Sequence, residues 1–119
     1  GLSPNLLFEF LQKQFFIETN LFEERLRELR EQFYLNEKLM TQTIQSLSLG
    51  EKKKVMLIAA FLLDSDLYVM DEPLSGLDQI SVENLLQLME QKINLGKHFI
   101  IVSHERQEIL PTVDQIISL

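Results

Sequence analysis

The stretch Leu67-Tyr68-Val69-Met70-Asp71-Glu72-Pro73 decides the fold, because an apolar run ends in two carboxylates and a proline. A continuous apolar segment with β-branched and aromatic residues predicts a strand buried on both faces, as in a parallel sheet. Asp71 and Glu72 then lie at the carboxyl end of the strand, where open α/β sheets bind ligands. If the pleat continues, their side chains point to opposite sides and suit different purposes, such as metal binding and base catalysis. A strand that ends in two solvated acids is the alternative interpretation of this stretch alone.

The composition predicts a soluble protein of one small domain. The chain has 119 residues, enough for a modest core, and its net charge of −7 argues against a general binder of nucleic-acid backbones. Because cysteine is absent, disulfides and thiolate metal sites are excluded, which fits a reducing compartment. The longest apolar run, Val55 to Leu63, is too short to span a bilayer, and no signal peptide is evident. We therefore expect a cytoplasmic chain.

Two amphipathic helices are predicted in the first third of the chain. Ser3 followed by Pro4 is typical of a helix start, because the hydroxyl caps the first turn. A second start is predicted at Asn20, with Glu23 in the capping-box position. The phenylalanines of this half could also form an apolar surface for a partner. The expected buried stripes are Leu6, Leu7, Phe10, Leu11 and Phe15 in the first helix, and Phe22, Leu26, Leu29 and Phe33 in the second.

A third helix is predicted after Leu47-Ser48-Leu49-Gly50-Glu51. Ser48 and Glu51 stand three residues apart before an apolar run, which is the capping-box pattern. The helix should run from about Leu49 to Leu63 and be largely buried. Its free N–H groups and partial positive charge suit a phosphate, and Gly50 lets a backbone or ligand approach closely. A capped helix without any ligand is the alternative.

The remainder predicts a strand-helix-strand unit with parallel strands. A tight turn at 74–78 leads into a helix from about Ile80 to Asn94, which Gly96 ends. A second buried strand, His98 to Val102, is followed by His104. This unit brings His104 to the sheet edge that carries the two acids, although a lone histidine there is also compatible with a surface position. Gln115 to Leu119 predicts one more strand.

Four motifs in this order resemble the ATP-binding-cassette (ABC) ATPase family. They are Leu47 to Glu51 as the signature motif, Leu67 to Glu72 as Walker B, Ser75 to Asp78 as the D-loop and His104 as the H-loop. The resemblance implies an α/β chain with part of the P-loop NTPase fold, in which parallel strands are flanked by helices. It also implies that residues 1–46 are part of a helical subdomain and that residues 47–119 belong to the ATPase core.

The chain departs from the family pattern in two respects. Leu49 and Glu51 replace the usual glycine and glutamine of the signature, so that a negative charge stands near the γ-phosphate. No Gly-x-x-x-x-Gly-Lys-Ser/Thr occurs, and the chain is expected to begin just after the Q-loop. Without this P-loop the chain alone is predicted to be inactive. The missing strand would lie next to Phe99 to Val102, which predicts an open apolar edge there that pairs with another chain.

The resemblance implies part of an ATP-hydrolysing ABC transporter subunit that uses ATP and Mg²⁺. Two ATPase domains would sandwich the nucleotides, and a membrane permease subunit would dock at the phenylalanines and hold the protein at the inner face of the cell membrane. No nucleic-acid partner is expected. The implied roles are Glu72 as general base, His104 at the γ-phosphate, Asp71 for Mg²⁺, and Ser48, Leu49, Gly50, Glu51 and Asp78 for nucleotide contact and communication between the sites.

Two alternatives stay open at this point. One is an ABC-class ATPase that works on DNA or ribosomes, which the acidic balance disfavours. The other is an interaction domain with a deficient nucleotide site, which offers its Ser48–Glu51 turn to a partner's ATP.

Overall fold

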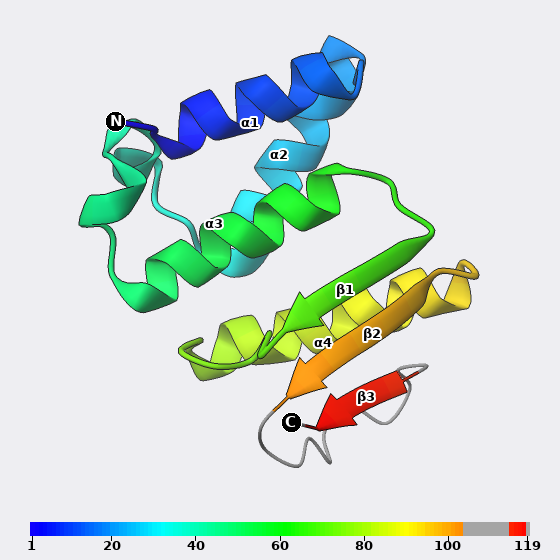
Figure 1. The fold of residues 1–119 in the computed structure, drawn as a ribbon. Coiled ribbons are helices and arrows are strands. Elements are labelled where there is room, and N and C mark those ends of the chain that lie inside the picture. Colours follow the sequence, from blue (N-terminus) through cyan, green and yellow to red (C-terminus); the bar gives the residue numbers. More distant parts are fainter. Residues whose placement is uncertain (104–114, 119) are drawn as a thin grey trace.

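Three parallel strands form one sheet in the order β1-β2-β3. The computed structural model describes residues 1–103 and 115–118. In Figure 1, α4 lies behind the strands, and α1 lies on the far side of α3 from the sheet. The elements are α1 (Pro4–Gln14), α2 (Thr19–Phe33), the 3-10 helices η1 (Glu37–Thr41) and η2 (Ile44–Ser46), α3 (Leu49–Leu62), β1 (Leu67–Asp71), α4 (Gln79–Asn94), β2 (His98–Ser103) and β3 (Gln115–Ser118).

The central strand of the sheet is β2, which has a parallel partner on each side. Tyr68 of β1 lies opposite Phe99, and Ile116 of β3 lies opposite Ile101. The predicted parallel pair of β1 and β2 and the final strand are therefore confirmed. The prediction of an open edge at Phe99 to Val102 is wrong, because β3 hydrogen-bonds to β2 there. Within residues 1–103 and 115–118, the edges of the sheet belong to β1 and β3.

The two faces of β1 differ in exposure. Tyr68 and Met70 are buried on one face, whereas Leu67 is 50% exposed and Val69 is 64% exposed on the other. The prediction of burial on both faces is therefore wrong within this chain, because packed helices cover a single face. A cleft of about 460 Å³ lies against the open face, between β1 and α3; its lining includes Val69 and Met56.

An aromatic cluster joins α3 to the covered face of the sheet. The rings of Tyr68 and Phe99 stack with centroids 4.9 Å apart, and Phe61 of α3 lies 5.1 Å from Tyr68. The Tyr68 hydroxyl donates to the carbonyl oxygen of Leu63 at 3.3 Å and accepts from the N–H of Ser65 at 3.4 Å. A buried tyrosine thus satisfies its polar end while its ring fills the core.

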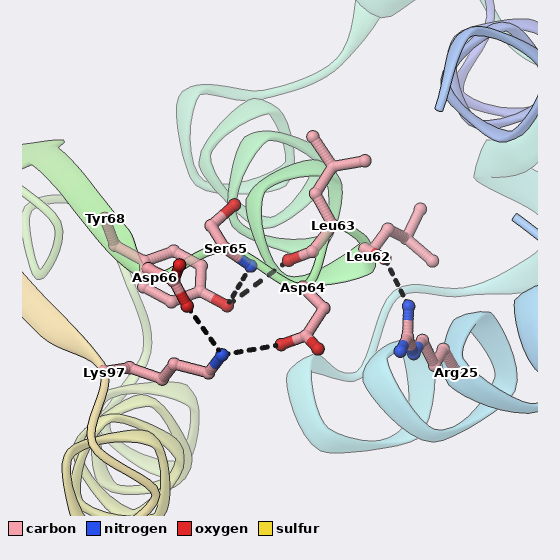
Figure 2. A network of polar contacts seen from close by, with 8 residues as sticks. All are labelled: Arg25, Leu62, Leu63, Asp64, Ser65, Asp66, Tyr68 and Lys97. Carbon is pink, nitrogen blue, oxygen red and sulfur yellow. Dashed lines mark hydrogen bonds and ion pairs between the residues drawn. The ribbon is translucent and has the colours of Figure 1, made fainter. Parts of the chain in front are cut away.

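Polar contacts fix both sides of the turn between α3 and β1 (Figure 2). Lys97, which precedes β2, pairs with Asp64 at 3.4 Å and Asp66 at 3.2 Å. From the other side, Arg25 of α2 donates to the carbonyl oxygen of Leu62 at 3.2 Å. These contacts orient α3 so that its amino-terminal end returns toward the carboxyl end of β1.

The amino-terminal helices confirm one predicted start and correct the other. Ser3 caps α1, and its hydroxyl accepts from the N–H of Leu6 at 3.2 Å. The start at Asn20 is wrong, because α2 begins at Thr19 and is capped by Glu18. Glu18 can replace a shorter cap since its carboxylate reaches two N–H groups of the first turn, at 2.9 and 3.0 Å.

The predicted buried stripe of α1 is confirmed at Leu7 and Leu11, which pack against the core, and is wrong at its other three residues. Phe8 is fully buried, whereas Leu6, Phe10 and Phe15 are 52%, 56% and 59% exposed. Because α1 carries apolar residues on more than one side, its packing against α3 and η1 determines which side is buried. The stripe of α2 is confirmed at Phe22, Leu29 and Phe33, all buried, with Leu26 packed against the same core. Among the described residues, no helix combines the length and apolar character that crossing a bilayer requires.

Candidate functional site

A reciprocal pair of hydrogen bonds closes the amino-terminal turn of α3. The Ser48 hydroxyl accepts from the N–H of Glu51 at 3.1 Å, and the Glu51 carboxylate accepts from the N–H of Ser48 at 2.8 Å. The predicted capping box is therefore confirmed. The side chain of Glu51 is turned back onto its own helix, while Leu49, in the same turn, is 81% exposed.

Asp71 and Glu72 end β1 in two different backbone conformations. Asp71 is the last strand residue and is exposed, whereas Glu72 is half-buried with a left-handed φ of 46°. The extended strand conformation therefore ends at Asp71. The sequence analysis expected the two acidic side chains to point to opposite sides only if the strand continued through Glu72, and it does not. The N–H of Glu72 donates to the carbonyl oxygen of Val102 at 2.8 Å, which ties the residue to β2. Such a conformation costs about 1–3 kcal/mol in a residue other than glycine and concentrates at functional sites.

Lys53 of α3 reaches the backbone that carries these two acids. Its Nζ donates to the carbonyl oxygen of Glu72 at 2.6 Å and lies 3.4 Å from that of Asp71. A lysine has three N–H donors, so that one ammonium can serve both carbonyls. The first turns of α3 are thus joined to the end of β1.

Asp78 links α3 to the start of α4. Its carboxylate accepts from the N–H of Ser81 at 2.7 Å as the N-cap of α4 and pairs with Nζ of Lys54 at 2.9 Å. The Lys54 ammonium, and after it the N–H of Ser81, lowers the pKa of Asp78 from 3.8 to about 2. The carboxylate therefore stays ionised at every physiological pH.

The lowered pKa of Asp78 predicts a pH-dependent contribution to stability. A group whose pKa falls on folding stabilises the folded state fully above its unfolded pKa of 3.8, and this stabilisation disappears as the pH falls through about 2. Asp78→Asn keeps a good N-cap but removes the charge. We expect this variant to unfold at a lower denaturant concentration than wild type at pH 7, and the difference to shrink between about pH 4 and pH 2. Glu90→Gln, on the exposed side of α4, is the control; an equal pH trend there would contradict the assignment.

The turn after β1 approaches α3 so closely that only glycine fits at position 50. A Cβ on Gly50 would lie 2.8 Å from the carbonyl oxygen of Gly76, closer than real Cβ contacts. Gly76 itself has a φ of 79°, which suits the tight turn predicted before Asp78. The signature-like turn and the D-loop-like turn are therefore in backbone contact.

The structure gathers the predicted residues around one end of α3. Ser48 to Glu51 lie at its amino-terminal end. Lys53 bonds to the backbone of Asp71 and Glu72, and Lys54 pairs with the side chain of Asp78. His104 lies outside the described residues, so that its place beside the acids stays a prediction. From the sequence, Lys53 and Lys54 are predicted only to add positive charge to the first turns of α3, together with Lys52; their contacts with residues 71, 72 and 78 were not predicted.

The donor set at this site fits a magnesium ion that is bound mainly by other ligands. No group of three or more metal-ligating side chains occurs in the part of the chain that the structure describes. Mg²⁺ usually takes one or two carboxylates together with substrate phosphates and waters. The exposed Asp71 at the strand end can supply one such carboxylate, directly or through water.

Comparisons with known proteins show which family the chain resembles. The model of the family described as "ABC transporter" matches residues 4–75. The chain is similar to the energy-coupling factor transporter ATP-binding protein EcfA3 of Oenococcus oeni, with 30% identity over 98% of this chain and 43% of the relative. It is also similar to the zinc transport system ATP-binding protein TroB of Treponema pallidum, with 33% identity over 67% of this chain and 30% of the relative.

A solved structure supports the same relationship in three dimensions. It is described as the structure of an ATP-binding subunit of an ABC transporter, and it superimposes with a TM-score of 0.77 at 30% identity. The match covers 86% of this chain and 42% of that chain, so that our chain spans less than half the length of these relatives. The helices and parallel strands are accordingly part of the P-loop NTPase fold. The chain belongs to the ABC transporter family of ATP-binding proteins.

Proposed function

We propose that the chain is part of an ATP-hydrolysing subunit that powers an ABC transporter. The observation that carries the proposal is the meeting of three segments at the amino-terminal end of α3. These segments are the capped turn at Ser48, the acids that end β1, and the D-loop-like turn that ends at Asp78. Together they offer helix N–H groups for a phosphate, a carboxylate for a cation and a candidate base. Each segment alone is common in proteins that bind no nucleotide.

Glu72 is the proposed general base for the attacking water. Its left-handed backbone and its bond to Val102 hold it at the end of β1, where a base needs a defined position. Asp71, exposed next to it, would bind Mg²⁺, which neutralises charge on the phosphates when it is bound. His104 would contact the γ-phosphate and hold the base and the water in place.

The Ser48–Glu51 turn is proposed to act on nucleotide held by a second ATPase domain. The Ser48 hydroxyl accepts a bond from Glu51 but still has a hydrogen to donate to a phosphate oxygen. Because the carboxylate of Glu51 accepts a hydrogen bond from the N–H of Ser48, its charge is partly balanced within the same turn. Gly50 and Leu49 would approach the phosphates from the same turn, while Asp78 would connect the two sites of the dimer.

We propose the following arrangement of the chain within the whole transporter. Residues 1–46 would be the helical subdomain, and residues 47–119 would belong to the ATPase core. The exposed Leu6 and Phe10 of α1, with its C-cap Phe15, support a docking place for a permease subunit, which would keep the protein at the inner face of the membrane. The open face of β1 and its cleft would be covered by the part of the domain that carries the P-loop.

A comparison of Mg-ATP binding by the chain alone and by a subunit with a P-loop tests the proposed function. We expect the 119-residue chain to show no saturable binding of Mg-ATP at micromolar concentration, because no P-loop supplies the main phosphate cradle. A subunit that contains this chain together with a P-loop is expected to bind and hydrolyse Mg-ATP. Fluorescent-nucleotide titration and phosphate release measure the two. Micromolar binding by the chain alone would contradict its inactivity, and a subunit without hydrolysis would contradict the proposed function.

A further inference from the structure

We propose that Lys53 and Lys54 are positioning residues, which tie the first turns of α3 to the backbone of Glu72 and to Asp78. The proposal rests on the proposed function, since it concerns the placement of the candidate base. It adds a mechanical link within one chain between the turn that would contact a partner's nucleotide and the base that would act on its own.

One face of α3 makes all the contacts. Gly50, Lys53 and Lys54 are spaced i, i+3 and i+4, which places them side by side on a helix. Gly50 touches the carbonyl oxygen of Gly76, and the two lysines reach residues 71, 72 and 78. This face of α3 therefore contacts the end of β1 and the loop after it at residues 71 and 72, at Gly76 and at Asp78.

Lys53 acts on the peptide groups rather than on the acidic side chains. Its bonds to the carbonyl oxygens of Asp71 and Glu72 fix the orientation of two successive peptide planes. The left-handed φ of Glu72 is unfavourable by itself, so that the conformation needs support from its surroundings. The 2.6 Å bond from Lys53 on one side and the bond to Val102 on the other supply that support.

Lys54 holds the other end of the loop. Its side chain is 13% exposed, and its partner Asp78 is also the cap of α4. A partly buried ammonium that pairs with a capping carboxylate links two helices through one residue. A shift of the α3 turn would then move Asp78 and Glu72 together, because both are bonded to adjacent residues of one helix.

Lys52 provides a matched control. It has the same charge and lies one residue before Lys53, but the i+2 position turns it away from the contact face. Within residues 1–103 and 115–118, no hydrogen bond or ion pair of Lys52 with the loop is found. Lys52→Met therefore removes charge and side-chain polarity from α3 without removing the link.

Amide hydrogen exchange on the 119-residue chain tests the link without ATP. We expect Lys53→Met and Lys54→Met to raise exchange of amides in residues 72–78 about tenfold, while amides of α2 keep wild-type rates. Lys52→Met should leave both regions unchanged. Equal exchange of residues 72–78 in all three variants and wild type would overturn the proposal. Faster exchange throughout α2 would also count against it, because the lysines would then support the whole fold.

Turnover in a subunit that contains this chain and a P-loop tests the positioning role. We expect Lys53→Met to lower kcat by up to about 10²-fold with an unchanged KM for ATP, because a displaced base affects the transition state. Lys53→Arg, whose guanidinium can donate to both carbonyls, should recover most of the loss, and Lys52→Met should match wild type. A raised KM at normal kcat would overturn the positioning role. An inactive wild-type subunit would instead reject the proposed function, while the exchange experiment still decides whether the link exists.

Discussion

Glu72→Gln is expected to lower ATP turnover by about 10²–10⁴-fold in a subunit that contains this chain together with a P-loop. Glutamine has the same shape but cannot accept a proton from water at neutral pH. The N–H of residue 72 bonds to Val102 and its carbonyl oxygen bonds to Lys53, and both of these backbone bonds survive the substitution. The backbone of residue 72 should therefore keep its place, and the loss should come from the missing base. Phosphate release under saturating Mg-ATP measures it.

The same variant should retain nucleotide-dependent association. Because binding of ATP precedes the proton transfer, Glu72→Gln is expected to accumulate the ATP-bound dimer, which size-exclusion chromatography with Mg-ATP detects. Glu83→Gln is the matched control, since Glu83 is exposed on α4 and its carboxylate accepts a hydrogen bond from Gln79 of the same helix. Normal turnover in Glu72→Gln would reject Glu72 as the base, and equal losses in both variants would indicate a general effect of removed charge.

Phe99→Ala is expected to destabilise the chain by about 3–5 kcal/mol. Phe99 is fully buried at the centre of the sheet, where its ring stacks on Tyr68 at 4.9 Å and lies 6.3 Å from the ring of Phe61. Truncation leaves a cavity between β1, β2 and α3 that these neighbours cannot fill. A small domain has only about 5–15 kcal/mol of stability in total, so that urea-induced unfolding should shift strongly.

Phe16→Ala is the control for this loss. Phe16 is 92% exposed, so that its truncation should change the free energy of unfolding by no more than about 0.5 kcal/mol. If Phe99→Ala cost less than about 1 kcal/mol, the aromatic cluster would not be the centre of the core.

Local patterns predicted the features that neighbouring residues control. Three predicted features appear in the structure: the cap at Ser3, the capping box of Ser48 and Glu51, and the parallel pairing of β1 and β2, which precede and follow α4 in the chain. Each depends on contacts within a few residues or on the order of elements along the chain. The start at Asn20 failed because Glu18 caps the same turn with a longer side chain, a competition that short-range rules rank poorly.

The sequence predicted which residues form the candidate site but not how they are placed relative to one another. The motif order indicated Ser48 to Glu51, Asp71, Glu72 and Asp78, because each motif is a short run of residues. The left-handed backbone of Glu72 was not predictable, and neither was the approach of the Gly76 carbonyl oxygen that leaves no room for a Cβ at position 50. Both arise where a helix meets a loop that follows much later in the chain, 19 residues from Lys53 to Glu72 and 26 residues from Gly50 to Gly76.

The sequence by itself determined the elements, their order and the family, because hydrophobic periodicity, capping residues and short motifs are local properties. Only the tertiary structure decided the buried side of α1, the exposed face of β1 and the position of β3 beside β2. It also decided that Lys53 and Lys54, rather than Lys52, hold the loop after β1. The physical reason is that each of these features depends on which surfaces pack together, and that choice is made by the whole chain at once.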